Sequence, residues 1–329
     1  MAFKDIAGNG RVKDILRLAL ERGRVPNSLL FCGPDGTGKR RAALTLAKAL
    51  NCLELTADSC DRCVACRAVD EGRFPDVMEI EAETRDIRIE QTRVLKQMAF
   101  LRPMVGRRRV FIIEDADKMN ADSANSLLKV LEEPPSFSHI VLLTARPFLL
   151  LPTIVSRCQT LAFSAVSSEE IESILSRRDV PPDQARILAL LVGGNLDRAL
   201  ELEWDDLQAS RDESWRLFES LLGRRRASLF LERFGSLTKS TQEEFQETLE
   251  LFSSFARDVL LLALGGDVRY LLNPDYEAPL REAAALLPPA RAMALLGAIG
   301  AVLSELRGNL NRNLLAAKFF SDFGELTHA

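Results

Sequence analysis

One glycine-rich stretch of the chain has the residue types and the spacing that bind phosphate groups. Residues 33–40 fit the pattern G-x-x-x-x-G-K-[ST] at every fixed position except the last, which is arginine. In such a loop the glycines let backbone N–H groups turn toward an anion, and the lysine carries positive charge to the outer phosphates. We therefore expect a phosphate-binding loop whose functional residues are Gly33, Gly36, Thr37, Gly38, Lys39 and Arg40.

Arg40 removes one part of the usual chemistry. A serine or threonine hydroxyl at this position offers a lone pair to Mg²⁺, whereas a guanidinium group has only donors and a fixed positive charge. The loop can therefore hold phosphates while it lacks a part needed to hydrolyse them, and the sequence leaves open whether it binds ATP or ADP. Since one cation would replace another, we hypothesise that Arg40 stands where Mg²⁺ would and pairs with Glu114 or Asp115.

These two acids end a second motif. The apolar residues 110–113 lead directly into Glu114 and Asp115, which is the pattern of a Walker B strand whose carboxylates hold Mg²⁺ and polarise water. The usual order is aspartate then glutamate, so the reach of both side chains is altered. Thr144 stands at the polar end of another apolar run, residues 140–144, and is the last candidate at this site. No further set of metal-binding carboxylates is visible, so we expect no polymerase site in this chain.

Four cysteines lie within fifteen positions and have the spacing C-x₇-C-x₂-C-x₂-C. They are Cys52, Cys60, Cys63 and Cys66. This set supplies the four thiolates of a closed, tetrahedral, structural Zn²⁺ site, and a reducing compartment favours a metal over disulfides. We expect zinc here, and the alternative is four reduced thiols without metal. Cys32 and Cys158 lie alone in apolar surroundings and are expected to be small buried hydrophobes.

Apolar strands and helices must position these groups. Helical patterns alternate with five strand-like apolar runs, at residues 29–32, 75–80, 110–113, 140–144 and 158–163. This alternation predicts a parallel sheet covered by helices on both faces. From residue 167 onward the pattern is helical throughout, with a Gly-Gly break at 193–194. We predict a nucleotide-binding-like domain over residues 1–164 with the cysteine insertion at 52–66, a small helical domain over 165–205, and a larger one over 206–329.

The composition of the 329 residues is that of a soluble globular protein, with 47% hydrophobic and 27% charged residues. Lys plus Arg total 43 and Asp plus Glu total 47, so no basic excess demands nucleic acid as a direct partner. No recognition helix of finger type follows the cysteines, which argues against a zinc protein that reads bases. We see no signal peptide and no apolar run near the ~20 residues of a membrane span, and expect a cytoplasmic protein without a membrane partner. The arginine run at 107–109 is either a basic patch or a solvated segment. For the run at 224–226 we favour a solvated loop.

Four further motifs extend along the chain, at residues 3–8, 124–135, 151–158 and 311–315. The most specific pieces are Leu-Glu-Glu-Pro-Pro at 131–135 and Ser-Arg-Cys at 156–158. Together with the phosphate loop and the cysteine insertion, they resemble the AAA+ clamp-loader subunits of the bacterial replicative enzyme, DNA polymerase III, over essentially the whole chain. The resemblance implies an α/β AAA+ P-loop domain with a parallel sheet, a small helical lid domain and an all-α collar domain for oligomerisation. It also implies the partners: gamma/tau and delta subunits in a ring of five, the sliding clamp, and primer–template DNA.

In that family the arginine of Ser-Arg-Cys reaches across an interface to the ATP held by the neighbouring subunit. Carried over, this arginine finger is Arg157, between Ser156 and Cys158. A rigid fork of donors delivered in trans matches the charge that develops on a transferred phosphate. The alternative for Arg157 is a surface ion pair.

The family also contains ATP-hydrolysing motor subunits, which keep a threonine after the loop lysine, an Asp-Glu order and an arginine in the lid. Here those positions hold Arg40, Glu114-Asp115 and Asp197, and Arg198 stands one place late, about 100° around a helix. All the positions that differ from the motor subunits belong to the chain's own ATP site, whereas Arg157, which would act on a neighbouring subunit, is retained. We therefore expect a stator, a subunit that donates its arginine and has lost its own ATPase activity. The alternative is a gamma/tau-type motor.

Overall fold

The computed structural model describes residues 2–82, 86–222, 233–234 and 239–306, and residues 315, 318, 319, 321 and 323. The chain divides into two compact units. The first comprises Met1–Asp179 and Val192–Leu200, and the second comprises Val180–Leu191 and Glu201–Ala329. The division into three domains at residues 165 and 206 stays a prediction. The arginine run at 224–226 and most of the 311–315 motif lie outside the described residues.

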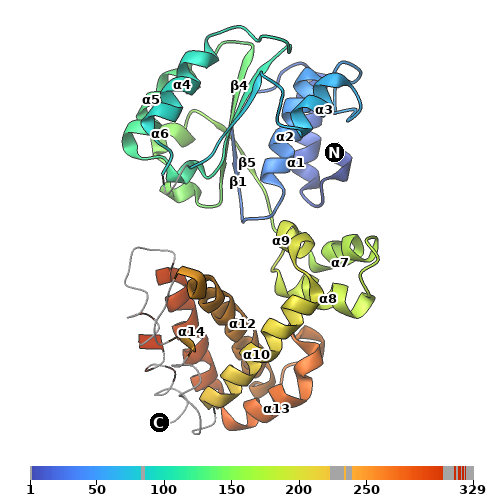
Figure 1. The fold of residues 1–329 in the computed structure, drawn as a ribbon, viewed down its shortest axis with the longest axis vertical. Coiled ribbons are helices and arrows are strands. Elements are labelled where there is room, and N and C mark those ends of the chain that lie inside the picture. The colour runs from blue at the N-terminus through green and yellow to red at the C-terminus, as the bar shows by residue number, and fades with distance from the viewer. Residues whose placement is uncertain are drawn as a thin grey trace. The chain divides into compact units, whose positions relative to one another are not determined.

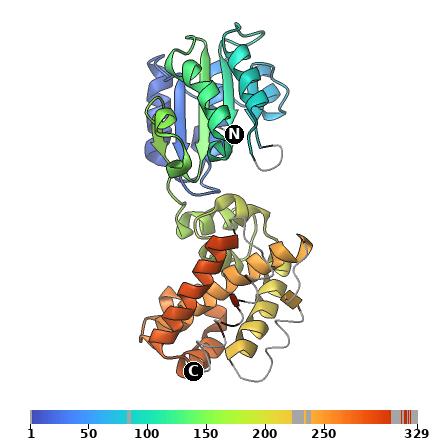
Figure 2. The same ribbon diagram turned by 90° about the vertical axis from the view of Figure 1, so that its left-hand side faces the viewer.

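A parallel sheet of five strands forms the centre of the first unit and confirms the predicted fold class. The strand order is β2-β3-β4-β1-β5, and Figure 2 shows the strands side by side. The strands are β1 (Ser28–Cys32), β2 (Val77–Ile80), β3 (Arg109–Ile113), β4 (Ser138–Thr144) and β5 (Gln159–Ala162). Because all strands are parallel, their carboxyl ends lie at one edge of the sheet, and loops after different strands meet there.

Helices cover both faces of this sheet, as the apolar strand runs predict. Figure 1 shows α1 (Gly10–Glu21), α2 (Lys39–Asn51) and α3 (Val64–Asp70) on one face. The other face carries α4 (Ile89–Ala99), α5 (Ala121–Glu132) and α6 (Pro152–Val155). Short 3₁₀ turns occur at Phe3–Asp5, Ala116–Lys118 and Pro147–Leu149, and α7 (Ser168–Ser176) follows the sheet.

The core of the first unit follows the two-residue period of the strands. In β1, Leu29 and Phe31 belong to the cluster beneath α1 and α2, whereas Leu30 belongs to the cluster beneath α4 and α5. Each such fully buried side chain contributes about 1.5–3 kcal/mol relative to an exposed one. The predicted cap of α5 is also present, because the Asn120 side chain accepts a hydrogen bond from the Ser123 N–H. The sheet is thus held by packing on both of its faces.

The second unit is helical in its described part. It contains α8 (Pro182–Leu191), α10 (Trp204–Leu222), α12 (Lys239–Ala263), α13 (Glu277–Leu286) and α14 (Pro289–Leu306), and the short turns Val268–Tyr270 and Pro274–Tyr276. The helix α9 (Leu196–Glu201) spans the boundary between the units in the sequence. An aromatic core holds α10 to α12, with Trp215 edge-on to Phe255 at a ring separation of 5.1 Å. Arg211 is fully buried in this unit and pairs with Asp275 at 2.7 Å.

Among the described helices, α14 is long and apolar enough to cross a membrane by length and composition, with a mean hydropathy of 1.3. The sequence reading did not single it out. One face of α14 packs in the core of the second unit through Leu295, Ile299 and Val302, which are nearly or fully buried. A helix that packs into a soluble core passes the same test, so the finding is weak evidence for a membrane span.

Candidate functional site

The glycine-rich loop follows β1 at the carboxyl edge of the sheet and leads into α2. Gly33 has a φ of +150°, and a Cβ added there would lie 2.1 Å from the carbonyl oxygen of Phe163. Gly38 has a φ of +84° in the left-handed region. Both positions therefore require glycine, because any other residue would be strained or would collide with the backbone.

The loop satisfies its own polar groups in this structure. The Lys39 ammonium donates to the carbonyl oxygens of Gly33 and Pro34, each at 2.7 Å, and its side chain is 10% exposed. Burial lowers the pKa of Lys39, although Asp35 and other nearby acids oppose the shift. Thr37 donates its hydroxyl to Pro34 O at 2.9 Å. The predicted phosphate ligands thus lie together, and the lysine is bound to the loop's own carbonyl groups.

Arg40 bridges Glu79, which lies near the end of β2, and Glu114, which directly follows β3. Its Nη2 lies 2.6 Å from Glu79 Oε2, and its Nε donates to Glu114. The hypothesised pairing with Glu114 is present. Glu79 was missed from the sequence, where the available signal was an acid near the end of the strand-like run at 75–80.

Burial lowers the pKa of Arg40, but the two carboxylates outweigh it and the pKa is raised. Burial raises the pKa of Glu114 against the opposing effect of Arg40. A guanidinium remains charged in either case. A fixed cation therefore pairs with Glu114, one of the two acids that would hold Mg²⁺ in a hydrolytic site.

Asp115 does not pair with Arg40. Its backbone is left-handed, with a φ of 45°, and its carboxylate binds the ammonium of Lys118 at 2.8 Å. Thr144 instead donates its hydroxyl to Asp117 at 2.5 Å. Arg146 holds the other oxygen of Asp117 at 2.6 Å. The sequence analysis assigned no role to Arg146 or Asp117.

The glycine-rich loop, together with Glu114, Asp115 and Thr144, lines a cavity of about 190 Å³ that has an excess of acids. The carboxylates are Asp35, Glu114, Asp115 and Asp197, and the cations are Lys39 and Arg40. Two more acids than cations make the cavity unfavourable for a polyphosphate in the absence of a metal ion.

The beginning of α9 is attached to the loop and to the first turn of α2. Leu196 N–H donates to Gly36 O at 3.1 Å, and Arg41 binds Asp197 at 2.6 Å. Gly36 has no room for a side chain, because an added Cβ would lie 1.6 Å from Asn195 Oδ1. Asp197, predicted to replace a phosphate-facing arginine, thus forms an ion pair beside the loop.

Arg157 lies at the opposite end of the sheet from this loop. The strands β1 and β5 are parallel, with Leu29 opposite Gln159 and Cys32 opposite Ala162. Arg157 precedes the first residue of β5 by two positions, whereas Gly33 follows the last residue of β1. At about 3.3 Å per residue, the two positions are roughly 20 Å apart along the strands. Arg157 is therefore too far away to contact a phosphate held by its own loop.

The Arg157 guanidinium has weak partners within the chain. Nη1 donates to Thr153 O at 3.0 Å, and Nη2 lies 3.4 Å from Glu132. In the part of the chain that the structure describes, its buried Nε has no hydrogen-bond partner. The side chain is 31% exposed, and an ion pair with so much solvent around it contributes about 0–1 kcal/mol. A stronger anion could therefore replace Glu132.

The two neighbours of Arg157 have structural contacts. Ser156 is exposed and donates to Thr153 O at 3.2 Å. Burial raises the pKa of Cys158 to about 12, so its thiol is protonated and unreactive near neutral pH. Of the three candidate residues at this end of the sheet, Arg157 alone presents a charged group for chemistry.

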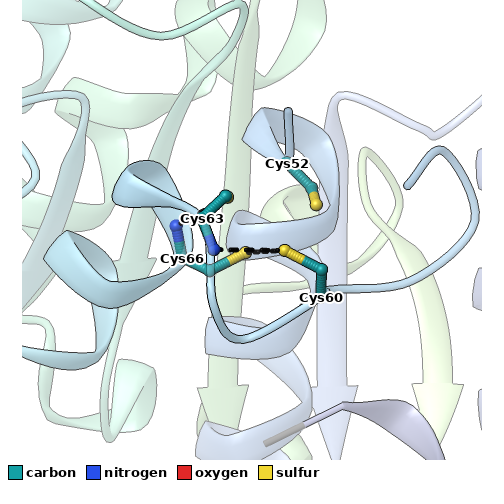
Figure 3. Close-up of side chains that lie close together, drawn as sticks. All are labelled: Cys52, Cys60, Cys63 and Cys66. Carbon is teal, nitrogen blue, oxygen red and sulfur yellow. Dashed lines mark hydrogen bonds between the residues drawn. The ribbon is translucent and has the colours of Figure 1, made fainter. Parts of the chain in front are cut away.

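The four clustered cysteines converge on one point, as Figure 3 shows. Cys52 follows α2 and Cys63 caps α3, while Cys60 lies in the loop between them. Their sulfur atoms all lie within 4.8 Å of one another, and Cys60 Sγ is 4.0 Å from Cys66 Sγ. Zn–S bonds of about 2.3 Å in a tetrahedron place sulfur atoms about 3.8 Å apart. The cluster therefore fits a tetrahedral metal site.

Backbone N–H groups point at these sulfur atoms. Leu55 donates to Cys52, Cys63 to Cys60 and Cys66 to Cys63, at 3.3–3.4 Å. Burial raises the pKa of Cys63, but the N–H groups lower it to about 7, whereas burial raises the pKa of Cys66. Such donors favour thiolate, which is the form that binds metal.

The arginine run before β3 is not a uniform basic patch. Arg109 is 3% exposed and binds Asp76 at 2.8 Å, in a buried ion pair that the sequence reading missed. Arg107 is exposed and Arg108 is half-buried.

Comparisons with known proteins find relatives over most of the chain. A family model described as DNA polymerase III, delta subunit, matches residues 8–167. The chain is 34% identical over 270 residues to DNA polymerase III subunit delta′ of Bacillus subtilis, covering 82% of each protein. It is 37% identical over 217 residues to subunit tau of Escherichia coli, covering 64% of this chain and 33% of that protein. A gamma subunit-related structure from Thermotoga maritima aligns over 96% of this chain and 99% of its own, with 21% identity and a TM-score of 0.47.

The five-stranded parallel sheet and its glycine-rich loop define an α/β P-loop protein of the AAA+ class. The similarity to subunit delta′ of Bacillus subtilis extends over most of both proteins and identifies a narrower family within this class. The chain belongs to the family of clamp-loader subunits of DNA polymerase III.

Proposed function

We propose that the chain is the delta′-type, non-motor subunit of the clamp loader. It acts as a stator that completes the ATP site of a neighbouring gamma/tau subunit and helps to load the sliding clamp onto primed DNA. The likeness to delta′ covers 82% of both proteins, whereas the likeness to tau covers 33% of that protein. This difference in coverage supports the assignment.

The observation that carries the proposal is the ion pair of Arg40 with Glu79 and Glu114. In a motor subunit a metal ion would bridge the acids and the nucleotide phosphates. A guanidinium fixed at this point repels Mg²⁺ and lacks a lone pair to coordinate it. We infer that the chain has no ATPase activity of its own and that nucleotide binding in its loop is weak.

The position of Arg157 supports the second half of the proposal. Its guanidinium has weak partners in its own chain and lies too far from its own loop, so a phosphate of a neighbouring subunit is the ligand that fits. We infer that gamma/tau, delta, the clamp and primer–template DNA are its partners in the cytoplasm. The cysteine cluster holds a structural Zn²⁺ that fixes the loop between α2 and α3.

The test is ATP hydrolysis by the purified chain alone and by the ring reconstituted with gamma/tau and delta. We expect no turnover alone and DNA-stimulated turnover in the ring. Arg157→Ala should remove the activity of the one site that this arginine completes, since an arginine finger contributes about 10³–10⁵-fold at its site. Arg157→Lys is the matched control for charge, and it should fail as well because it lacks the planar fork.

Two results would refute parts of the proposal. Ring turnover that is unchanged in Arg157→Ala would exclude the trans role. Mg²⁺-dependent turnover by the chain alone would favour the alternative, a gamma/tau-type motor, which the tau relative keeps open.

A further inference from the structure

A second cavity lies in the first unit, away from the glycine-rich loop, and Leu55 and Thr56 of the cysteine segment are part of its lining. It has a volume of about 690 Å³ and is formed near the ends of α1 and α2 and the beginnings of β1, β3 and β4. Its walls include Arg24, Arg107, Arg108 and His139, with Leu20 and Leu50 among the apolar residues. The strand beginnings place it at the opposite sheet edge from the loop. Its volume lies in the range of sites for small organic ligands.

The cavity carries an excess of positive charge. No carboxylate lines it, and within the described residues Arg24, Arg107 and Arg108 make no ion pair. The helices α1 and α2 end at the cavity, and each C-terminus contributes about half of a negative charge. Together the two helix C-termini offset about one of the three positive charges on the guanidinium groups. The remaining charge favours an anion.

Two of these arginines are held in place by buried contacts. The side chain of Asn51 is 1% exposed and accepts the N–H groups of Arg107 and Arg108 at 2.8 and 2.9 Å. Arg108 Nη1 donates to Ser136 O at 3.0 Å. Bonds of this kind fix the backbone from which both guanidinium groups extend. The backbone of the site is therefore preorganised, which lowers the entropic cost of binding.

Arg24 is fixed at the end of α1. Gly23 adopts a φ of +60°, and the Arg24 N–H donates to Ala19 O at 2.9 Å, which closes the helix. The third arginine thus comes from a separate segment, and the three positions surround the cavity from two sides of the fold.

A buried imidazole adds a polar group to the wall. His139 is 3% exposed, and its Nδ1 lies 3.1 Å from Pro26 O, which accepts the Nδ1–H. In the neutral ring Nε2 is then an acceptor, and no described residue donates to it. Burial lowers the pKa of His139 to about 4, so the ring stays neutral. The imidazole therefore lies at the cavity wall as a neutral, buried group.

We propose that this cavity binds a phosphomonoester of mononucleotide size, with its phosphate on Arg24, Arg107 and Arg108 and its organic part against the apolar wall. Guanidinium forks match the geometry of phosphate oxygens. The same chemistry is offered by a free nucleotide and by the 5′-phosphorylated end of a DNA strand. The proposal does not depend on the stator role.

The experiment uses the full chain and adenosine monophosphate without Mg²⁺. The sequence has 2 histidines, His139 and His328, so the imidazole NMR signals can be assigned with His328→Gln. We expect adenosine monophosphate to shift the His139 signal. Arg24→Gln and Arg107→Gln should each weaken binding about tenfold, as the loss of a hydrogen bond to a charged group does.

Two controls separate this site from other anion binding. Arg22→Gln removes an exposed arginine that does not line the cavity and should leave the affinity unchanged. Lys39→Ala disables the glycine-rich loop and should also leave the His139 response unchanged. No shift of His139 at 10 mM ligand, or affinities unaltered in Arg24→Gln and Arg107→Gln, would overturn the proposal.

A second titration distinguishes the two sources of the phosphate. A 5′-phosphorylated oligodeoxynucleotide is compared with its 5′-hydroxyl counterpart. Tighter binding of the phosphorylated strand, lost in Arg107→Gln, assigns the site to a strand end. Equal binding of the two strands, with adenosine monophosphate still bound, assigns it to free nucleotides.

Discussion

The buried ion pair between Asp76 and Arg109 gives the sharpest test of how the first unit is held together. Both side chains are within 3% of full burial, and their charged atoms are 2.8 Å apart. Asp76 also accepts the N–H groups of Met104, Val105 and Gly106, each at 2.8 Å. We expect Asp76→Asn to cost about 3–5 kcal/mol, because it leaves the buried charge of Arg109 without a counter-charge, although Arg109 still donates to Met98 O. That loss is a large part of a total stability of about 5–15 kcal/mol.

Urea unfolding followed by two probes measures this loss. Both tryptophans, Trp204 and Trp215, lie in the second unit, so their fluorescence reports that unit. Far-ultraviolet circular dichroism reports both units. We expect the variant to lower the circular dichroism midpoint and to leave the tryptophan midpoint in place. Glu277→Gln, which breaks an exposed pair with Arg281, should change stability by less than about 0.5 kcal/mol.

The difference in stability between the wild type and Asp76→Asn depends on pH in a defined direction. Burial raises the pKa of Asp76, but the three N–H groups and Arg109 outweigh it, so the pKa is lowered. A lowered pKa in the folded state gives stability that is present above the unfolded pKa of about 3.9 and is lost as the pH falls below it. The gap between wild type and Asp76→Asn should therefore be constant above about pH 5 and shrink in acid. A loss below about 1 kcal/mol at neutral pH would refute the reasoning, because it would mean that Arg109 reaches water.

Three further outcomes test the loop and the metal site. Gly33→Ala should destabilise the first unit by more than about 2 kcal/mol in urea, since its Cβ would lie 2.1 Å from Phe163 O; an unchanged midpoint would show that the loop moves freely. Cys60→Ser should lower the bound zinc measured by atomic absorption and make the loop after α2 more sensitive to protease, whereas Cys32→Ser, outside the cluster, should retain the metal. Arg40→Thr should raise Mg²⁺-dependent nucleotide affinity in calorimetry, because it removes the competing cation; no gain would mean that the acids around the loop exclude nucleotide by themselves.

Local patterns predicted the parallel sheet because each strand is a short apolar run with turn or acidic residues at its end. The run at 110–113 became β3, and the acids after it lie at the predicted edge. The Cys spacing likewise placed four sulfur atoms together, since both ends of the loop are fixed by helices. These features depend on residues close in sequence.

The missed features depend on pairs far apart in sequence. Asp76 meets Arg109 because parallel pairing of β2 and β3 places Val77 opposite Val110. Glu79 of β2 meets Arg40 of α2, although the two residues are far apart in the sequence. A strand pattern carries no information on which strand is its neighbour, so the partner of a charged residue stays unknown. Asp197 was found as a departure from a motif, but its ion pair with Arg41 required the fold.

Arg157 and the glycine-rich loop lie at opposite ends of the sheet, so the first unit has two different functional ends. If the arginine of one subunit meets the loop of the next, the two contact surfaces differ, and the subunits associate head to tail. Such an interface extends a row or closes a ring and does not form a twofold dimer. A member with an intact arginine end and an inactive loop end has only one functional side. Under our proposal this subunit therefore occupies the end of the row of active ATP sites in the assembly.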